Sequence, residues 1–174
     1  MKLRFFLLAI LYSCVNILLL HSQTVGLKVN DGFLPSAFPL VSDRSHAVIF
    51  HDKAEDVAVV RAIHDLSTDC YRVTKKSPPI RLNAELTKYP IIIGTIGVSK
   101  TIDQLIANKH IKAEHLANKW ESFVIVTVEN PFDGVEMALV IAGSDRRGTI
   151  YGVYELSQQL GVSPWHWWAD VPPL

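Results

Sequence analysis

The residues that could carry chemistry gather in one stretch, which runs from Gly143 to Pro172. Its first part places Asp145, Arg146 and Arg147 at the expected start of a helix. An aspartate suits the partial positive charge of a helix N-terminus, whereas two arginines do not. A fixed polar contact across a domain boundary would account for these arginines, so we interpret the stretch as part of a domain junction.

Two glycines, Gly148 and Gly152, lie about one turn apart in the same expected helix. Each glycine costs roughly 1 kcal/mol of helix stability relative to alanine, so both positions indicate that another part of the protein comes close. Tight packing of the helix on a sheet is the simpler explanation. Contact with a neighbouring domain is the alternative.

The end of the stretch concentrates indole side chains, because Trp165, Trp167 and Trp168 are three of the four tryptophans in the chain. No local core is evident to bury them. A following domain, which we favour, or a sugar, whose apolar ring face stacks on indole, would cover them. Their neighbour Asp170 is an acid whose surroundings would raise its pKa. One carboxyl group does not make a glycosidase, which needs two, so we interpret Asp170 as a hydrogen-bond acceptor at the junction.

The other motifs give weaker signals. The loop at 94–99, Gly-Thr-Ile-Gly-Val-Ser, lacks the dinucleotide and phosphate-loop patterns, which favours a plain strand-to-helix turn. His110 and His115 have a spacing that does not place two ligands on one helix face. No Gly-x-Ser-x-Gly elbow occurs. We therefore expect no metal, no cofactor and no nucleophile system.

The N-terminus has the pattern of an export signal, because Lys2 and Arg4 precede an apolar stretch at 5–20. This stretch is shorter than the roughly 20 apolar residues of a membrane span. We predict cleavage after Ser22 and an exported protein, periplasmic or secreted, with no membrane anchor. A lipid anchor at Cys14 is the minor alternative, disfavoured because the apolar run continues past it.

Cleavage would leave 152 of the 174 residues, which is enough for one domain. The 17 basic and 17 acidic residues balance, and loss of Lys2 and Arg4 leaves a slight acidic excess. This balance gives no support to nucleic-acid binding. Cleavage also removes Cys14, so Cys70 has no disulfide partner, and we expect it to be a buried, unreactive thiol.

The elements that position these residues follow from hydrophobic spacing. A strand is expected at 46–50, and Asp52 with Glu55 resembles a helix-opening capping box. The apolar residues of the following helix share one face. These residues are Val59, Ile63, Leu66 and Cys70.

A second strand is expected at 90–93, where a continuous apolar run is typical of burial on both faces. A helix from about Ser99 follows it, and the runs 123–128 and 137–142 predict an antiparallel hairpin. The last helix is expected to open at Ser144 or Asp145 and to end at Gly161.

These elements predict an α/β fold with a small mixed sheet of about four strands packed with helices. We place this domain at 46–163, after a signal peptide at 1–22 and an extended lead-in at 23–45. Residues 164–174 would then form the junction to a further domain.

Three segments, 89–105, 119–131 and 143–172, closely resemble the start of glycoside hydrolase family 115, the xylan α-glucuronidases. The resemblance covers about Phe38 to Pro173. It implies a large, exported enzyme with an N-terminal α/β domain and a central (β/α)8-like catalytic barrel. Such enzymes remove α-1,2-linked glucuronic acid, or its 4-O-methyl ether, from xylan.

In this family the catalytic carboxylates come from the barrel, and the sequence stops at Leu174, about where the first barrel strand should start. The resemblance therefore implies a non-catalytic N-terminal domain that is inactive alone and has the missing C-terminal barrel as its partner. Six residues would form the domain junction or a cleft wall. They are Asp145, Arg146, Gly148, Trp167, Trp168 and Asp170. The alternative is a stand-alone carbohydrate-binding module that holds xylan on the surface 165–168.

Overall fold

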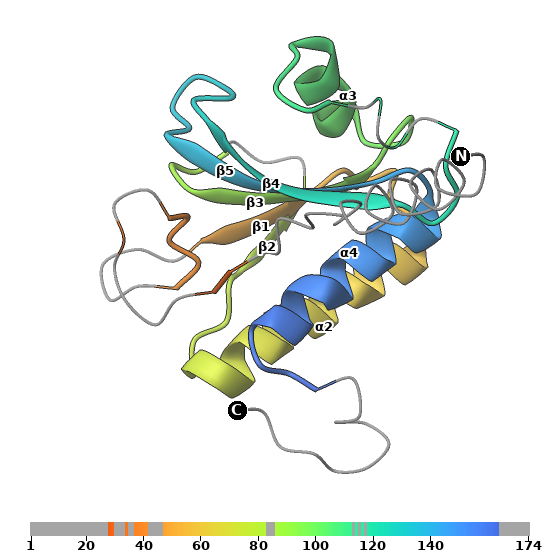
Figure 1. The fold of residues 1–174 in the computed structure, drawn as a ribbon. Helices are drawn as coiled ribbons and strands as arrows, with labels where there is room; N and C mark the ends of the chain where they lie inside the picture. The colour runs from red at the N-terminus through yellow and green to blue at the C-terminus, as the bar shows by residue number, and fades with distance from the viewer. Residues whose placement is uncertain are drawn as a thin grey trace, which may run out of the picture.

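A five-stranded β-sheet lies between helices on both of its faces (Figure 1). The structure is a computed structural model, and it describes residues 28–29, 34, 37–41, 47–82, 86–112, 114, 116 and 118–163. The elements in chain order are β1 (Val48–His51), α2 (Val57–Thr74), β2 (Ile80–Leu82), β3 (Pro90–Thr95), α3 (Lys100–Ala107), β4 (Phe123–Glu129), β5 (Met137–Gly143) and α4 (Arg146–Gln159).

The sheet has the strand order β2-β1-β3-β5-β4. Strands β2, β1, β3 and β5 are parallel, whereas β4 pairs antiparallel with β5, from Phe123 opposite Gly143 to Glu129 opposite Met137. The predicted mixed sheet and hairpin are therefore confirmed. The strand that the sequence did not reveal is β2, whose three residues at the sheet edge are too short to show a period.

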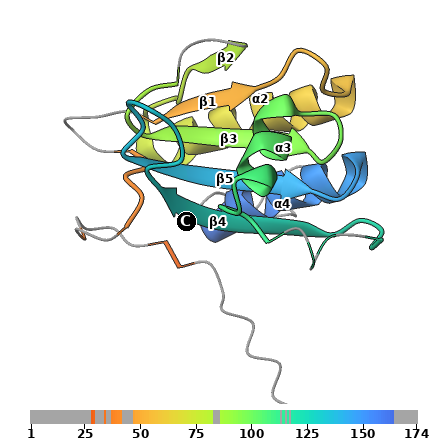
Figure 2. The ribbon, with the colours of Figure 1, turned by 90° about the horizontal axis from the view of Figure 1, so that it is seen from above.

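The two faces of the sheet carry different helices, as Figure 1 and the view from above in Figure 2 show. Helices α2 and α4 pack side by side on one face, over Ile91 and Ile93 of β3. Helix α3 covers the other face, over Ile92. All six residues of β3 are buried, as its apolar run predicted. Each fully buried isoleucine contributes roughly 1.5–3 kcal/mol to the hydrophobic stabilisation.

The helix boundaries agree with the sequence except at α2. Its N-cap is Asp56, whose carboxylate accepts a hydrogen bond from the N–H of Ala58, so the capping box assigned to Asp52 and Glu55 is wrong. Those two side chains instead make contacts across the sheet, which local spacing does not indicate. The other expected helix starts, near Ser99 for α3 and at Ser144 or Asp145 for α4, are confirmed, and the N-caps are Ser99 and Asp145.

The predicted apolar face of α2 is also confirmed, because its four residues are all within the buried core. Burial raises the pKa of the Cys70 thiol to about 12, which leaves it protonated and unreactive. From the expected lead-in, Phe38 and Leu40 pack against the same core. No helix in the described part of the chain is both long and apolar enough to cross a membrane.

Candidate functional site

The carboxyl ends of the parallel strands β1, β3 and β5 meet at one edge of the sheet, and the start of β4 lies there too. The loops at 52–56, 96–99 and 144–145 follow these strands, and the loop at 118–122 leads into β4. In open α/β sheets, ligands bind at the carboxyl ends of the strands. This edge is therefore where the structure places the candidate site.

Asp145 ties two parts of this edge together. Its Oδ1 accepts a 2.8 Å hydrogen bond from the N–H of Gly148, which caps α4, and its Oδ2 accepts a 2.7 Å bond from the N–H of Glu121. The backbone N–H groups of Glu121 and Gly148 lower the pKa of Asp145, so the side chain is ionised at neutral pH. Ser144 and Ser122 add two hydrogen bonds, of 2.8 and 3.1 Å. The loop at 118–122 is thereby latched onto the start of α4.

The two glycines of α4 permit this close packing. A Cβ atom on Gly148 would lie 2.3 Å from the carbonyl oxygen of Ser122, and one on Gly152 would lie 2.7 Å from Cγ2 of Ile141. The close approach that the sequence indicated is real. It is made by the sheet and the latched loop of the same domain, which favours the packing explanation.

Both arginines of the motif have partners within the described part of the chain. Arg146 Nη1 lies 3.3 Å from Asp56 Oδ2, and Arg147 Nη1 lies 2.9 Å from Glu121 Oε1. Contacts inside the domain therefore account for the arginines without a second domain. The junction role of Asp145, Arg146 and Gly148 stays a prediction.

The structure brings the first three predicted junction residues together at the start of α4. The other three, Trp167, Trp168 and Asp170, lie outside the described residues, as do Trp165 and the expected junction at 164–174. Whether the two halves of the motif meet is therefore a prediction as well.

A second polar cluster, which the sequence did not reveal, fills the space between β1, β3 and α4. Glu55 is only 8% exposed, and it accepts hydrogen bonds from the N–H of Thr95 at 2.8 Å and from the Thr95 hydroxyl at 3.0 Å. The Thr95 hydroxyl lies 2.8 Å from the Thr149 hydroxyl, which lies 3.0 Å from the Asp145 carbonyl oxygen. A continuous row of oxygens thus joins the three loops.

The position of Glu55 in this row affects its acidity. Burial raises the pKa of Glu55, against the opposing effect of the two hydrogen bonds that it accepts from Thr95. A buried carboxyl group thus connects the end of β1 to β3 and α4.

Asp52 reaches the start of α3 instead of capping α2. The Ser99 hydroxyl donates to its Oδ2 in a short hydrogen bond, and the N–H of Thr101 donates to the same oxygen at 3.2 Å. The loop at 94–99 is the plain strand-to-helix turn that the sequence favoured. Asp52 therefore binds this turn to the end of β1.

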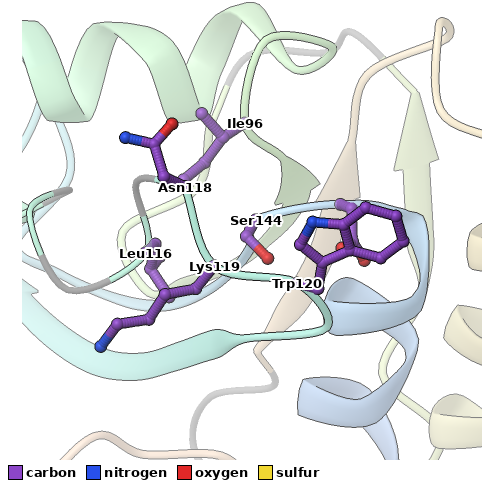
Figure 3. Close-up of a pocket in the computed structure, with 7 residues that line it drawn as sticks. Ile96, Leu116, Asn118, Lys119, Trp120 and Ser144 are labelled. Atoms are coloured by element: carbon purple, nitrogen blue, oxygen red, sulfur yellow. The ribbon is translucent and has the colours of Figure 1, made fainter.

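A cavity opens beside the latched loop, with a volume of about 480 Å³ (Figure 3). Trp120 stands at its rim and is 88% exposed. The residues that line the cavity are Ile96, Leu116, Asn118, Lys119, Trp120, Ser144 and Asp145. Trp120 is a candidate residue that the sequence motifs did not indicate, since it lies apart from the tryptophans near the C-terminus. Its position between Lys119 and Glu121 was the available signal, since flanking charges indicate an exposed indole.

The described residues contain no group of three histidine, cysteine or carboxylate side chains that could hold a metal ion. His110 is exposed at the end of α3, and His115 lies outside the described residues.

Comparison with known proteins gives an informative similarity. No protein-family model and no curated protein matches the chain. Among solved structures, the chain is 38% identical to BtGH115A, described as a novel family GH115 4-O-methyl-alpha-glucuronidase with specificity for decorated arabinogalactans. That match has a TM-score of 0.56 and covers 73% of this chain but only 15% of BtGH115A. A match to CpGH84D, 12% identical with a TM-score of 0.49 over 68% of this chain and 18% of that one, carries no argument.

The chain therefore has an α/β fold related to that of a family 115 glucuronidase, and the similarity supports a function related to glycoside hydrolysis. The predicted resemblance is confirmed to this extent. The chain spans 15% of the length of the glucuronidase that it matches.

Proposed function

We propose that this chain is the N-terminal, non-catalytic domain of a secreted α-glucuronidase that removes α-1,2-linked (4-O-methyl)glucuronic acid from xylan. The observation that carries this proposal is the similarity to BtGH115A, 38% identical over 73% of this chain. In such an enzyme the chemistry would belong to a catalytic barrel that follows this domain.

The chemistry of the carboxyl edge favours a supporting role over a catalytic one. Glycoside hydrolysis needs a carboxylate pair that acts on the substrate. The Asp145 carboxylate binds two backbone N–H groups, and Glu55 is buried against Thr95. Neither side chain is available as an acid, base or nucleophile, so we assign both to the architecture of the domain.

The surface that we assign to the barrel contact is the start of α4. The side chain of Arg146 is 59% exposed there, and Asp145 and Gly148 fix the backbone around it. A rigid turn with an exposed guanidinium is suited to a carboxylate or backbone carbonyl on a second domain. Trp167, Trp168 and Asp170 would continue the same contact into the barrel.

The family resemblance and the similarity to BtGH115A both indicate a substrate that carries a uronic acid. The resemblance of the sequence points to xylan, whereas BtGH115A is described as specific for decorated arabinogalactans. The experiment should therefore compare the two polysaccharides, and glucuronoxylan is expected to be the better substrate.

Two measurements test the proposal. An antibody raised against residues 47–163 should detect a native species several times heavier than 19.5 kDa in the source cells. That species, captured with the antibody, should release uronic acid from glucuronoxylan, with arabinogalactan compared in parallel. The purified 174-residue chain is the control and should release none. A native species near 19.5 kDa, or release by the short chain alone, would overturn the proposal.

A further inference from the structure

Trp120 is the most exposed of the large apolar side chains that the structure describes, at 88%. The backbone that carries it is nevertheless held firmly. The loop donates to Asp145 and Ser144, and its Ser122 carbonyl oxygen accepts from the N–H of Ser144 at 2.8 Å. Arg147 adds an ion pair to Glu121. The indole is therefore presented to solvent from a fixed position, which is typical of a binding platform and not of a mobile loop.

Two residues in the left-handed region bracket the platform. Asn118 has φ 60° and Glu121 has φ 55°. Asparagine adopts this conformation readily, but for glutamate it costs roughly 1–2 kcal/mol. Glu121 is held in it by the N–H···Asp145 hydrogen bond and the Arg147 ion pair. Strain maintained in this way is often found at functional sites.

The cavity beside Trp120 has the size and lining of a small-molecule site. Its volume of about 480 Å³ lies within the usual range of roughly 300–1,000 Å³ for such sites. Ile96 and Leu116 supply an apolar wall, while Asn118 and Ser144 supply an amide and a hydroxyl group. One indole beside hydrogen-bonding groups matches a sugar ring, which has apolar faces and hydroxyl edges. A protein domain would call for several buried anchor residues.

The charges that line the cavity favour an acidic sugar over a neutral one. Lys119 is the only cation among the described residues that line the cavity, and Asp145 is the only anion. Both carboxylate oxygens of Asp145 are engaged by backbone N–H groups. In Figure 3, Trp120 lies on one side of Ser144 and Lys119 on the other, with the Lys119 side chain extending away from Trp120. A carboxylate on a ligand over Ser144 would form a charge-assisted hydrogen bond with the ammonium group once the flexible Lys119 side chain turns toward it.

We propose that this cavity is an accessory subsite for a hexuronic acid residue of a polysaccharide, whose ring stacks on Trp120 and whose carboxylate pairs with Lys119. The inference rests on the proposed function, which it deepens by giving this domain a direct contact with the acidic polysaccharide. Asn118 and Ser144 bind the hydroxyl groups of the same sugar.

The test is a titration of the 174-residue chain, followed by NMR through the indole N–H signals, with two matched probes. Methyl α-D-glucuronoside carries the carboxylate, and methyl α-D-glucoside is its neutral counterpart. The glucuronoside is expected to bind more tightly and to shift the Trp120 signal, which is assigned by its loss in Trp120→Phe. Equal affinities for the two probes, or no shift of this signal, would overturn the inference.

Variants separate the two contacts. Trp120→Ala should weaken binding of both sugars by about tenfold, because it removes the stacking surface. Lys119→Met keeps the apolar stem and should weaken binding of the glucuronoside alone, by about threefold. Lys100→Met removes an exposed cation that does not line the cavity and should change neither affinity. Equal losses in Lys119→Met and Lys100→Met would contradict the pairing.

The opposite outcome is that another domain of the native protein covers Trp120. If Trp120 in the heavy native species resists oxidation by N-bromosuccinimide while the isolated chain reacts, another domain covers the indole and the subsite is overturned. The size and uronic acid release of that species would be unaffected, so this result would leave the proposed function standing.

Discussion

Glu55 and Asp145 lie at the same edge of the sheet and accept two hydrogen bonds each, but their pKa values are shifted in opposite directions. Asp145 binds two backbone N–H groups at the start of a helix, and its pKa is lowered. Glu55 binds the N–H and hydroxyl of Thr95 in the interior, and its pKa is raised because burial outweighs those bonds. The number of hydrogen bonds therefore does not by itself set the direction in which a carboxyl pKa is shifted. The extent of burial has to be weighed against those bonds.

The two groups accordingly have different structural roles. Asp145 is an ionised carboxylate that holds the loop of Trp120, and Glu55 is a buried carboxyl group that ties the end of β1 to β3 and α4. Four predictions test this contrast, from the largest expected effect to the smallest.

The largest effect is expected at Gly148, where close packing supports the loop that Asp145 holds. Gly148→Ala should destabilise the domain by about 2–3 kcal/mol, because the new methyl group would meet the backbone oxygen of Ser122. Gly152→Ala is the matched control in the same helix and should cost less, since its nearest neighbours are the side-chain atoms of Ile141 and Phe123, which can shift. Urea unfolding measures both, and a stabilising Gly148→Ala would show that the close approach is not maintained in solution.

At the buried carboxyl group, Glu55→Ala should cost about 2 kcal/mol, because the buried N–H of Thr95 would lose its acceptor. Glu55→Gln mimics the protonated carboxyl and should be at least as stable as the native chain at pH 7. The native folded-state pKa is raised above the ordinary value of 4.5, so stability should fall as the pH rises from about 4.5 through that pKa. Glu55→Gln should remove this slope, and a native-like slope in the variant would assign the titration to another group.

The contribution of Asp145 to stability should show the opposite pH dependence. The pKa of Asp145 is lowered from 3.8, so its stabilisation is complete above that pH and is lost as the pH falls below it. Asp145→Asn should cost about 1 kcal/mol at pH 7, because the amide can accept from one N–H but presents its own N–H₂ to the other. Unfolding curves between pH 2 and pH 7 should show a smaller loss of stability at acidic pH in this variant. Glu55→Gln should keep the loss seen in the native chain.

The smallest effect is expected at Arg146. Its ion pair with Asp56 is solvent-exposed, and such pairs contribute little, so Arg146→Ala should leave the melting temperature of the isolated chain unchanged. In the full-length polypeptide the same substitution should speed limited proteolysis between this domain and the barrel. Arg61→Ala, on the outer side of α2, is the control and should not. Equal proteolysis of both variants would argue against the junction role of Arg146.

Local pattern predicted the elements that have strong periodicity. The apolar run of β3, the hairpin of β4 and β5, and the helix starts near Ser99 and at Ser144 or Asp145 were all identified from the sequence. The short strand β2 was not, because Arg81 and Leu82 are exposed at the sheet edge and leave no buried pattern.

The candidate site was predicted only in part, for a related reason. Gly148 carried its own signal, since glycine within a helix is unfavourable unless space requires it. Glu55 carried a misleading one, because its spacing from Asp52 resembles a capping box while its partner Thr95 lies 40 residues away in sequence. Trp120 could be recognised as exposed from its neighbours, but the cavity beside it is formed by residues from separate loops.

The sequence by itself determined the alternation of strands and helices, the buried thiol and the family resemblance, because these depend on local spacing and residue type. Tertiary structure alone decided the direction in which the pKa of each carboxyl group is shifted, and where Trp120 stands. Those properties depend on burial and on partners up to 54 residues apart, such as Thr95 and Thr149, which meet only when the parallel strands align their carboxyl ends.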